Sequence, residues 1–248
     1  MDNVKISLIT VCRNAADTIS RCIESVICQN FKDFEYIIVD GASTDGTIEI
    51  VNEYKFRINK IISEPDQGIY DAMNKGIKLA SGSIAAMLNA DDYFADEMVL
   101  SNVAAAFDQE NTGIVYGDID YVNKAGHVTR KWRSGKYSEH LFNFGWMPPH
   151  PAFYCKRELF YQIGFYSPDY GTAADYELML RFIHSNKVNT FYLKKVMVKM
   201  QSGGASNKNI KSRASSLYYD FIAMQHHKLP IPVLTVALKP LRKVIQYF

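Results

Sequence analysis

Four successive apolar runs of this sequence each end in a cluster of polar, mostly acidic side chains. A polar residue at such a point caps the following helix or turns the chain, and Asp, Asn, Ser and Thr are favoured there. Capping needs one such residue per helix, whereas these clusters hold several each, so together they indicate a binding site. The clusters are Thr10-Val11-Cys12-Arg13-Asn14, Asp40-Gly41-Ala42-Ser43-Thr44-Asp45-Gly46, Ser63-Glu64-Pro65-Asp66-Gln67-Gly68 and Asn89-Ala90-Asp91-Asp92.

The residue types in the last cluster favour a metal–diphosphate site. Asp91 and Asp92 end an apolar run, with Asn89 two residues before Asp91. Oxygen ligands of this kind suit Mg²⁺ or Mn²⁺, which complete their coordination with water and substrate phosphates. Residues 41–48 have the glycine spacing of a phosphate loop but lack its Lys, and the chain has no Gly-x-Gly-x-x-Gly, Gly-x-Ser-x-Gly or His-Glu-x-x-His motif.

Strand-like and helix-like segments alternate through the first half of the chain, and this order brings the polar clusters together. The alternation predicts βαβ units and therefore a parallel sheet with helices on both faces. The carboxyl ends of parallel strands meet at one edge, which is where such sheets bind ligands. The expected strands are residues 5–11, 34–39, 58–63, 83–88 and 113–116, and the expected helices are residues 19–27, 47–54, 69–80 and 96–107.

The second half of the chain has a different pattern. We expect a hairpin over residues 118–133, followed by an aromatic-rich loop that ends at Pro148-Pro149-His150-Pro151. Helical spacing then covers two segments before a strand, a longer helix and a tail with several prolines. These elements are helices at residues 156–163 and 175–183, a strand at residues 188–200, a helix at residues 210–227 and a tail from residue 229.

The composition indicates a folded protein and excludes several classes. Of the 248 residues, 48% are hydrophobic, which is ample for a buried core. A net charge of +2 argues against a nucleic-acid-binding protein. The four cysteines form no Cys-x-x-Cys pair, so a reducing cytosol is the simplest interpretation. We expect a cytoplasmic protein, because the sequence begins without a signal-peptide pattern and no apolar run approaches the roughly 18 residues of a transmembrane helix.

The near-neutral total conceals an uneven distribution of charge. Residues 205–248 hold seven basic side chains and one acidic one, whereas residues 1–204 hold 21 basic and 25 acidic ones. From residue 229 onward, apolar and basic residues alternate in a way that fits an anionic membrane surface, or a helix packed on the domain or on a second subunit of a homodimer. The basic segment 203–213 is either a lid that reaches a diphosphate or a linker.

Several of these segments, in this order, resemble the motifs of family 2 glycosyltransferases of the GT-A fold. The resemblance is strongest to the subgroup of bacterial exopolysaccharide and lipopolysaccharide biosynthesis, and it covers residues 4 to about 205. The matching segments include the four clusters above; the third continues through Ile69-Tyr70-Asp71-Ala72-Met73-Asn74-Lys75-Gly76, and the fourth begins one residue earlier, at Leu88. Two later segments also match, namely Met147-Pro148-Pro149-His150-Pro151-Ala152-Phe153 and Ala173-Ala174-Asp175-Tyr176-Glu177-Leu178-Met179-Leu180-Arg181.

The resemblance implies a fold and a division of the chain. The expected fold is α/β of the GT-A type, with a Rossmann-like, mostly parallel sheet flanked by helices and a C-terminal helical extension. Residues 1–204 would form the glycosyltransferase domain, with a nucleotide-sugar half at residues 1–118 and an acceptor half at residues 119–204. Residues 205–248 would be a basic, amphipathic extension.

The resemblance also implies an activity. It predicts inverting transfer of a sugar from a nucleotide diphosphate donor, UDP by family likeness, to a hydroxyl of a glycan or lipid-linked acceptor in cell-surface polysaccharide synthesis. The implied cofactor is Mg²⁺ or Mn²⁺, and the implied localisation is the cytoplasm, including the inner face of the plasma membrane.

The donor-binding residues follow from the matching motifs. Asp40 matches the family Asp that accepts a hydrogen bond from the base of the donor, and a carboxylate facing an imide N–H rejects bases that leave it unpaired. Thr10, Arg13 and Asp66 lie on the same predicted edge and are expected to bind base, ribose or diphosphate, although Arg13 could equally pair with an acid of the next loop.

The metal position follows from the last cluster. Asp91 matches the final Asp of the family's Asp-x-Asp motif, which contacts the metal that neutralises the departing diphosphate. The first position of that motif is Asn89 in this sequence, and its amide is expected to bond a ribose hydroxyl or metal-bound water. Asp92 is expected to begin the next helix or to support the metal ligand.

The acceptor side follows from two motifs. Asp175 matches the family's general base, which takes the proton from the attacking hydroxyl, although an Asp in the first turn of a helix also caps it. Ala174 stands where many relatives have Glu, and Glu177 is the lesser candidate for the base. Trp146 and His150 are expected to contact the acceptor sugar.

Two other interpretations remain at this point. A non-catalytic protein that binds nucleotide sugars as a scaffold would explain Asn89 and Ala174. A sugar-1-phosphate nucleotidyltransferase shares a similar fold but should carry a glycine-rich loop with Lys or Arg after the first strand, and residues 12–16 contain no glycine.

Overall fold

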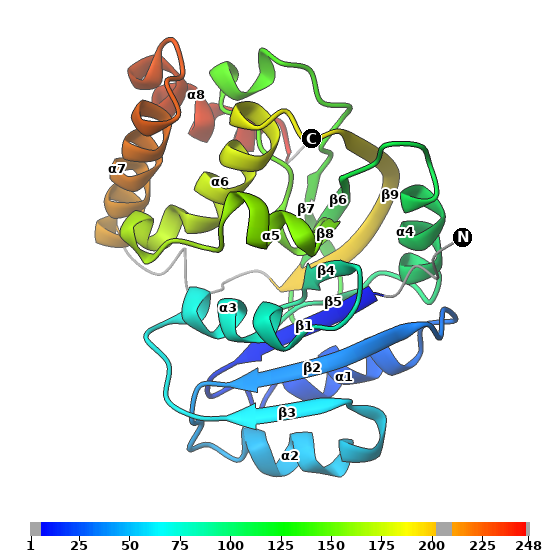
Figure 1. The fold of residues 1–248 in the computed structure, drawn as a ribbon. Coiled ribbons are helices and arrows are strands. Elements are labelled where there is room, and N and C mark those ends of the chain that lie inside the picture. Colours follow the sequence, from blue (N-terminus) through cyan, green and yellow to red (C-terminus); the bar gives the residue numbers. More distant parts are fainter. Residues whose placement is uncertain (1–5, 202–209, 247–248) are drawn as a thin grey trace.

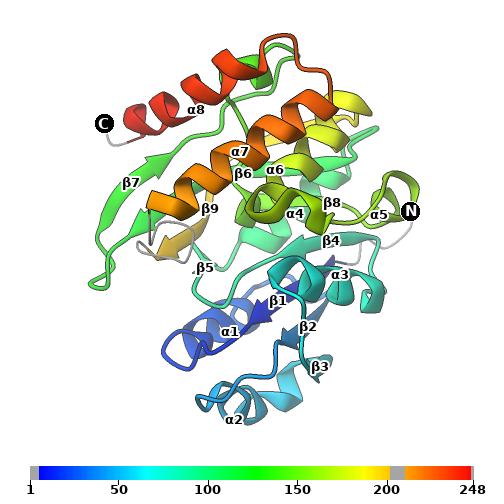
Figure 2. The same ribbon diagram turned by 90° about the vertical axis from the view of Figure 1, so that its left-hand side faces the viewer.

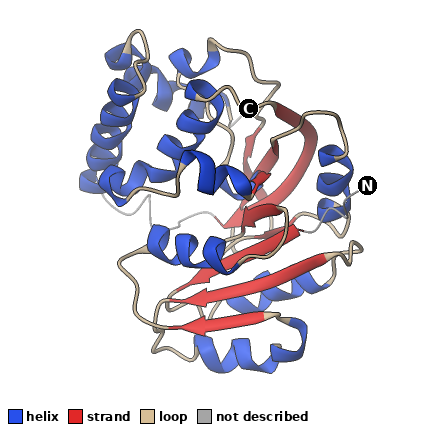
Figure 3. Cartoon of the chain, viewed as in Figure 1, coloured by secondary structure: helices blue, strands red, loops and turns tan. Residues whose placement is uncertain are grey.

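A mixed β-sheet with helices on both faces forms the centre of the protein (Figures 1 and 3). The computed structural model describes residues 6–201 and 210–246. The strand order is β3-β2-β1-β4-β8-β6-β9-β5, and β7 pairs with β6. The strands are β1 (Ile6–Cys12), β2 (Phe34–Asp40), β3 (Lys60–Ser63), β4 (Ile84–Met87), β5 (Tyr93–Phe94), β6 (Ile114–Val122), β7 (Val128–Trp132), β8 (Phe153–Lys156) and β9 (Thr190–Gln201). The α-helices are α1 (Ile19–Ile27), α2 (Thr47–Glu53), α3 (Ile69–Leu79), α4 (Val99–Phe107), α5 (Glu158–Ile163), α6 (Ala174–Met179), α7 (Ile210–His226) and α8 (Pro232–Ile245).

The first four strands of the sheet order are parallel, as the alternating pattern predicts. β1 pairs with β2 and with β4, and β2 pairs with β3. In this register Cys12 lies opposite Asp40, and Asp40 lies opposite Ser63. The carboxyl ends of β1, β2 and β3 are therefore level, and the polar clusters that follow them start from one edge. The predicted α/β sheet with parallel strands and flanking helices is confirmed.

Strand β8 was not expected, and it changes the sheet beyond β4. It lies between β4 and β6 and is antiparallel to both. The predicted hairpin is β6 with β7, and β6 is in turn parallel to β9. Four residues between a proline-rich turn and a helix give no periodic signal, so β8 could be placed only from its neighbours. The predicted boundary at residues 118 and 119 falls inside β6, which means that both halves share one sheet.

Both faces of β1 are buried, and alternate residues belong to two separate cores. Ile9 and Val11 pack with α3 on one face, whereas Leu8 and Cys12 pack with α1 on the other. Helix α3 lies so close to β1 that a Cβ at Gly76 would stand 2.4 Å from Cγ2 of Ile9. This contact fixes α3, and with it the cluster that precedes α3, against the centre of the sheet.

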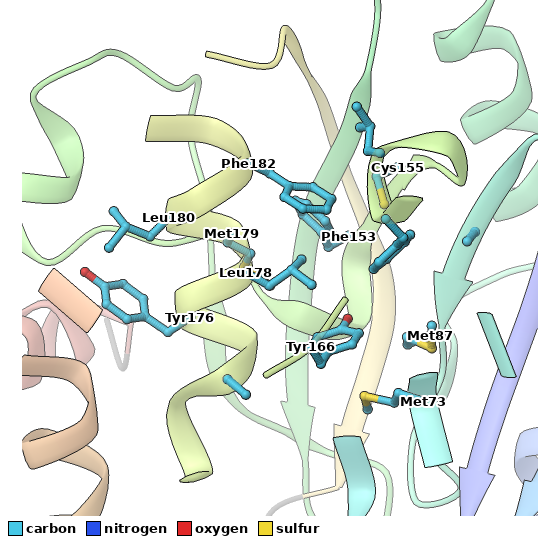
Figure 4. Packing of buried hydrophobic residues seen from close by; sticks show 14 of the residues in the cluster. Met73, Met87, Phe153, Cys155, Tyr166, Tyr176, Leu178, Met179, Leu180 and Phe182 are labelled. Atoms are coloured by element: carbon cyan, nitrogen blue, oxygen red, sulfur yellow. The ribbon is translucent and has the colours of Figure 1, made fainter. Parts of the chain in front are cut away.

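Helix α6 lies between the sheet and the C-terminal helices. Figure 4 shows Leu178 and Phe182 directed toward Phe153 on β8, while Tyr176 and Leu180 leave α6 on the opposite side. All four of these helical side chains are completely or almost completely buried. The predicted helix over residues 175–183 is thus confirmed, with its last turn widened into a π-helix over Leu180–Ser185.

The described part of the C-terminal extension packs on the domain. α7 lies along α6, and α8 crosses above it with its C-terminal end near β7 (Figure 2). Nζ of Lys239 lies 2.6 Å from Oδ1 of Asp220 and 3.5 Å from the ring centroid of Tyr176. The hydroxyl of Thr235 donates to the backbone oxygen of Asn143 at 2.7 Å. The inner face of the predicted amphipathic tail therefore covers the protein core.

The tail is helical despite its prolines. Pro232 stands at the first position of α8, where the missing N–H costs nothing, and Pro240 lies inside the helix. None of the helices in residues 6–201 and 210–246 has both the length and the apolar character needed to span a membrane.

Candidate active site

Asp40 connects the loops at the edge of the sheet. Its carboxylate accepts hydrogen bonds from the Ser63 hydroxyl at 2.6 Å and from the Ser43 backbone N–H at 3.0 Å, and the Ser43 hydroxyl donates to it as well. The exposed fraction of Asp40 is 0%, and its contact with a donor base stays a prediction. As placed, the carboxylate orders the floor of the site.

The side chains of Arg13 and Asp66 both approach Gly41, at the edge that the strand-end pattern predicts. A Cβ at Gly41 would stand 2.2 Å from Oδ2 of Asp66 and 3.3 Å from Cδ of Arg13, so a larger residue there would displace the Asp66 carboxylate. Asp66 also accepts the backbone N–H of Gly68 at 2.9 Å, which shapes the turn into α3. The side chain of Arg13 is exposed. A cation and an anion from two different loops thus converge at the edge.

The loops after β1 and β2 brace each other. Asn14 accepts the Thr44 N–H at 2.9 Å through its side chain, and its own N–H donates to the Ser43 hydroxyl at 2.8 Å. Asn14 and Ala42 have left-handed backbone angles, with φ of 51° and 57°. For Ala42 such a conformation costs on the order of 1 kcal/mol, and it persists because the surrounding hydrogen bonds determine it. The edge is therefore preorganised.

Thr10 does not reach this edge. Its exposed fraction is 0%, and its hydroxyl lies 3.0 Å from the Tyr36 hydroxyl. It shares a strand face with Leu8 and Cys12, beneath α1, because side chains alternate along a strand. This position corrects the expectation that Thr10 lines the ligand site.

The cluster after β4 contains two neighbouring carboxylates that differ in exposure. Asp91 is partly exposed, whereas Asp92 is 1% exposed, and burial followed by the charge of Asp91 raises the pKa of Asp92 well above its usual range. Within the described residues, neither carboxylate oxygen of Asp92 nor Oδ1 of Asn89 makes a hydrogen bond of normal geometry. Asp91 is thus the carboxylate of this pair that solvent and ligands can reach.

These groups fit a hard divalent cation that brings most of its own ligands. The described residues contain no group of three His, Cys, Asp or Glu side chains arranged to hold a metal ion. The partly exposed carboxylate of Asp91 could supply one oxygen ligand, while the unpaired amide oxygen of Asn89 is buried beside it in the chain. A diphosphate and water would have to supply the others, which is the usual arrangement for Mg²⁺ bound with a nucleotide.

Asp175 lies in the first turn of α6 with its side chain partly exposed. Its Oδ1 accepts the backbone N–H of Tyr176 at 2.8 Å and the hydroxyl of Tyr70 at 3.3 Å. His150 belongs to the same group, because its Nε2 lies 3.0 Å from the Tyr166 hydroxyl and burial lowers its pKa despite the nearby charge of Asp175. The structure therefore brings together Asp175 and His150, two residues predicted for the acceptor side.

Glu177, the lesser candidate for the base, has a structural environment instead. It is 2% exposed and pairs with Arg181 at 2.9 Å and with His227 at 2.8 Å. Burial raises its pKa, but the hydrogen bonds from His227 and Arg181 outweigh burial and lower the pKa below its usual range. Glu177 links α6 to the end of α7 and is not exposed to an acceptor.

Trp146 is a core residue. It is 3% exposed, packs edge-on against Tyr116 and Phe142, and donates from its indole N–H to the Ser134 oxygen at 2.7 Å. No face of the indole is available for stacking on a sugar. This burial corrects the expectation that Trp146 contacts the acceptor, and the reason is that the aromatic loop folds inward under α8.

Two aromatic residues of this group, Tyr70 and Tyr166, were not among the predicted site residues. Tyr70 belonged to a matching motif, and its aromatic side chain at the start of α3 was the available signal. Tyr166 belonged to none of the motifs and gave no signal. The basic segment 203–213, expected as a lid or a linker, lies largely outside the described residues, which resume at Ile210.

Comparison with known proteins identifies relatives. A family model described as "Glycosyl transferase family 2" matches residues 7–172. A Mycobacterium bovis "PGL/p-HBAD biosynthesis glycosyltransferase" is 32% identical over 206 residues, which cover 81% of this chain and 78% of the relative. The Escherichia coli protein WfaP, a "UDP-Glc:alpha-D-GlcNAc-diphosphoundecaprenol beta-1,3-glucosyltransferase", is 28% identical over 236 residues, which cover 90% and 89%.

Solved structures share the fold. S. aureus TarS 1–349 in complex with UDP-GlcNAc superposes with a TM-score of 0.68 at 18% identity, covering 91% of this chain and 68% of TarS. The mannosyltransferase PcManGT from Pyrobaculum calidifontis, solved with GDP-Man and Mn²⁺, superposes with a TM-score of 0.66 at 16% identity, covering 94% and 68%. At these identities the likeness concerns the fold alone.

Proposed function

This chain belongs to glycosyl transferase family 2, and we propose that it transfers a sugar from a UDP-sugar to a hydroxyl of a glycan or lipid-linked acceptor, with inversion at the anomeric carbon. The observation that carries this proposal is the contact between Tyr70 and Asp175 at 3.3 Å. Tyr70 follows Asp66 by four residues, so this contact brings a partly exposed carboxylate next to the polar edge of the sheet.

The residues divide the reaction between them. Asp175 takes the proton from the acceptor hydroxyl as that oxygen attacks the anomeric carbon, and a single displacement of this kind inverts the configuration. Arg13 faces the diphosphate, and Asp66 orders the turn into α3 by accepting the Gly68 N–H. Asp91, with Asn89, would bind Mg²⁺ or Mn²⁺, which supplies a Lewis acid for the departing diphosphate.

The substrate classes are supported by the relatives. The name of the E. coli relative specifies UDP-glucose as donor and a GlcNAc-diphosphoundecaprenol as acceptor. Carried over to this chain, these names give a UDP-sugar donor and a lipid-diphosphate-linked sugar acceptor, in bacterial cell-surface glycan synthesis. A partly exposed Asp175 with neutral His150 beside it suits an uncharged sugar hydroxyl.

Nucleotide-sugar turnover tests the function directly. We expect release of UDP from one member of a panel of UDP-glucose, UDP-galactose, UDP-GlcNAc and GDP-mannose, stimulated by a synthetic GlcNAc-diphospholipid and by Mn²⁺. The same donor should raise the melting temperature more in the presence of Mn²⁺ than in EDTA, because a ligand that binds the native state stabilises it. Absence of turnover with every donor, despite nucleotide binding, would indicate a scaffold and contradict the proposal.

We also propose that the outer face of α8 contacts an anionic membrane surface. Val233 and Leu241 on this face are 71% and 61% exposed. The backbone N–H of Lys131 donates to the Gln246 oxygen at 2.7 Å, which places the basic strand β7 beside the end of α8. The side chain of Lys131 on β7 is exposed, whereas Arg133, which directly follows β7, pairs with Asp120 at 2.7 Å. Apolar residues next to cations favour an anionic lipid interface.

Vesicle flotation tests this surface in the full chain, because truncation would uncover the core beneath α8. We expect the double variant Val233→Ser/Leu241→Ser to float about tenfold less with phosphatidylglycerol vesicles than the wild type, since two exposed apolar side chains are lost. The matched control replaces Phe56, which is 89% exposed far along the chain, with Ser. Equal flotation of the wild type and the double variant would contradict membrane contact. A dimer that the wild type forms and the double variant does not form would contradict it as well.

A further inference from the structure

Helix α3 presents two polar side chains, one turn apart, to the acceptor half of the protein. The hydroxyl of Tyr70 lies 3.3 Å from Oδ1 of Asp175 and 3.3 Å from the Thr172 oxygen. The side-chain amide of Asn74 donates to the Tyr166 oxygen at 2.9 Å and accepts the Tyr166 N–H at 3.0 Å. Residues four apart share one face of a helix, so a single face of α3 makes all of these contacts.

The ring of Tyr70 is fixed in place by its neighbours. It stacks on the ring of Tyr166 with centroids 5.5 Å apart and an interplanar angle of 24°. Tyr166 is 4% exposed, and its own hydroxyl lies 3.0 Å from Nε2 of His150. Since Asn74 also holds the Tyr166 backbone, the hydroxyl of Tyr70 has little freedom to leave Asp175. Burial, followed by the charge of Asp175, raises the pKa of Tyr70, so the phenol keeps its proton as a donor.

The two acceptors of Tyr70 have a chemical consequence. A phenol has one proton to donate, and here the Asp175 carboxylate and the Thr172 carbonyl lie at the same distance from it. While Asp175 is ionised, the charged oxygen is the stronger acceptor. Once Asp175 has taken up a proton, Tyr70 can turn to Thr172 without leaving its hydroxyl unpaired. The pair of acceptors therefore accommodates both protonation states of the base.

The two carboxylate oxygens of Asp175 also differ in their hydrogen bonds. Both hydrogen bonds, from Tyr70 and from the Tyr176 N–H, go to Oδ1. Among the described residues, Oδ2 accepts no hydrogen bond. Oδ1 is thus used for orientation, and Oδ2 is left for the hydroxyl of an acceptor.

We propose that Tyr70 is the positioning residue of the general base: its hydroxyl orients Asp175 so that Oδ2 faces the acceptor, and it couples the base to the loop that carries Asp66. This inference rests on the proposed role of Asp175. It gives a role to the hydroxyl of Tyr70, in a segment that also packs against β1 through Gly76 and holds the Tyr166 backbone through Asn74.

The test removes the hydroxyl and keeps the ring. We expect Tyr70→Phe to lower kcat by about tenfold, the effect of one hydrogen bond to a charged group. The KM for the donor and the Kd for UDP should stay within about a factor of two, because the stacking on Tyr166 and the nucleotide edge are intact. The donor is the UDP-sugar with the fastest turnover in the panel above. The matched control is Tyr161→Phe, which alters a 55% exposed tyrosine of α5 and should change none of these values.

A double-mutant cycle shows whether Tyr70 acts through Asp175. If it does, Tyr70→Phe has no further effect on the residual rate of Asp175→Asn, since there is no base left to orient. Equal fold-losses in both backgrounds would overturn the inference, and so would an unchanged kcat in Tyr70→Phe. A fully active Asp175→Asn variant would instead overturn the proposed base itself, so the two failures are distinguishable.

Discussion

Replacing Asp175 with Asn is expected to lower kcat for sugar transfer by about 10²- to 10⁴-fold, the usual contribution of a general base. Asparagine has nearly the same shape and can still accept hydrogen bonds from Tyr70 and from the Tyr176 N–H at its oxygen. What the variant lacks is the ability to take up a proton. Transfer should therefore fail while the fold and the donor site persist.

The measurement separates chemistry from binding. UDP should bind Asp175→Asn with a Kd within about twofold of the wild type, and kcat and kcat/KM should fall together, as for an interaction made only in the transition state. Asp169→Asn is the matched control, because Asp169 is an exposed Asp six residues earlier whose carboxylate accepts only the Ser167 hydroxyl among the described contacts. Full activity of Asp175→Asn would remove the assignment of the base.

Asp91→Asn is expected to abolish the response to Mn²⁺ and to lower kcat/KM by about 100-fold, since a Lewis acid at a departing diphosphate contributes several kcal/mol. The reason is that Asp91 is the reachable carboxylate of its cluster, whereas Asp92 is buried with its pKa raised. Asn89 cannot replace Asp91, because a neutral amide binds a hard cation more weakly than a carboxylate.

A binding measurement checks the metal role independently of turnover. In the wild type, Mn²⁺ should increase the thermal stabilisation by UDP, and Asp91→Asn should lose that increase while the stabilisation by UDP in EDTA stays the same. The matched control is Asp108→Asn, an exposed Asp at the end of α4. If Mn²⁺ enhanced UDP binding to Asp91→Asn as much as to the wild type, the metal would have to be bound elsewhere.

Local sequence patterns determined most of the donor edge. The apolar runs that became β1, β2 and β4 are continuous and short, and each is followed by turn-forming residues, so both the strands and their ends could be predicted. Parallel pairing then brings consecutive strand ends to one edge without further information. The convergence of Arg13 and Asp66 above Gly41 follows from that rule.

Only the tertiary structure decided which polar residues are accessible. Thr10 and Trp146 lie in predicted site segments, yet both are buried, because the direction of a side chain depends on strand register and on how a distant helix folds over a loop. Asp175 and Glu177 are two residues apart and have similar chemistry. Arg181 and His227 pair with the carboxylate of Glu177, whereas the hydroxyl of Tyr70 contacts the carboxylate of Asp175.

The difference between the two kinds of information is one of range. Strand ends, turns and helix starts depend on residues a few positions apart, so they can be predicted from the sequence. Tyr70, the partner that orients Asp175, lies 105 residues from it in the sequence. Thr235 of α8, the helix that buries the aromatic loop, donates a hydrogen bond to Asn143, which lies 92 residues away. The sequence by itself determined the chemistry present at this site, and the packing of distant segments decided which of those groups can reach a substrate.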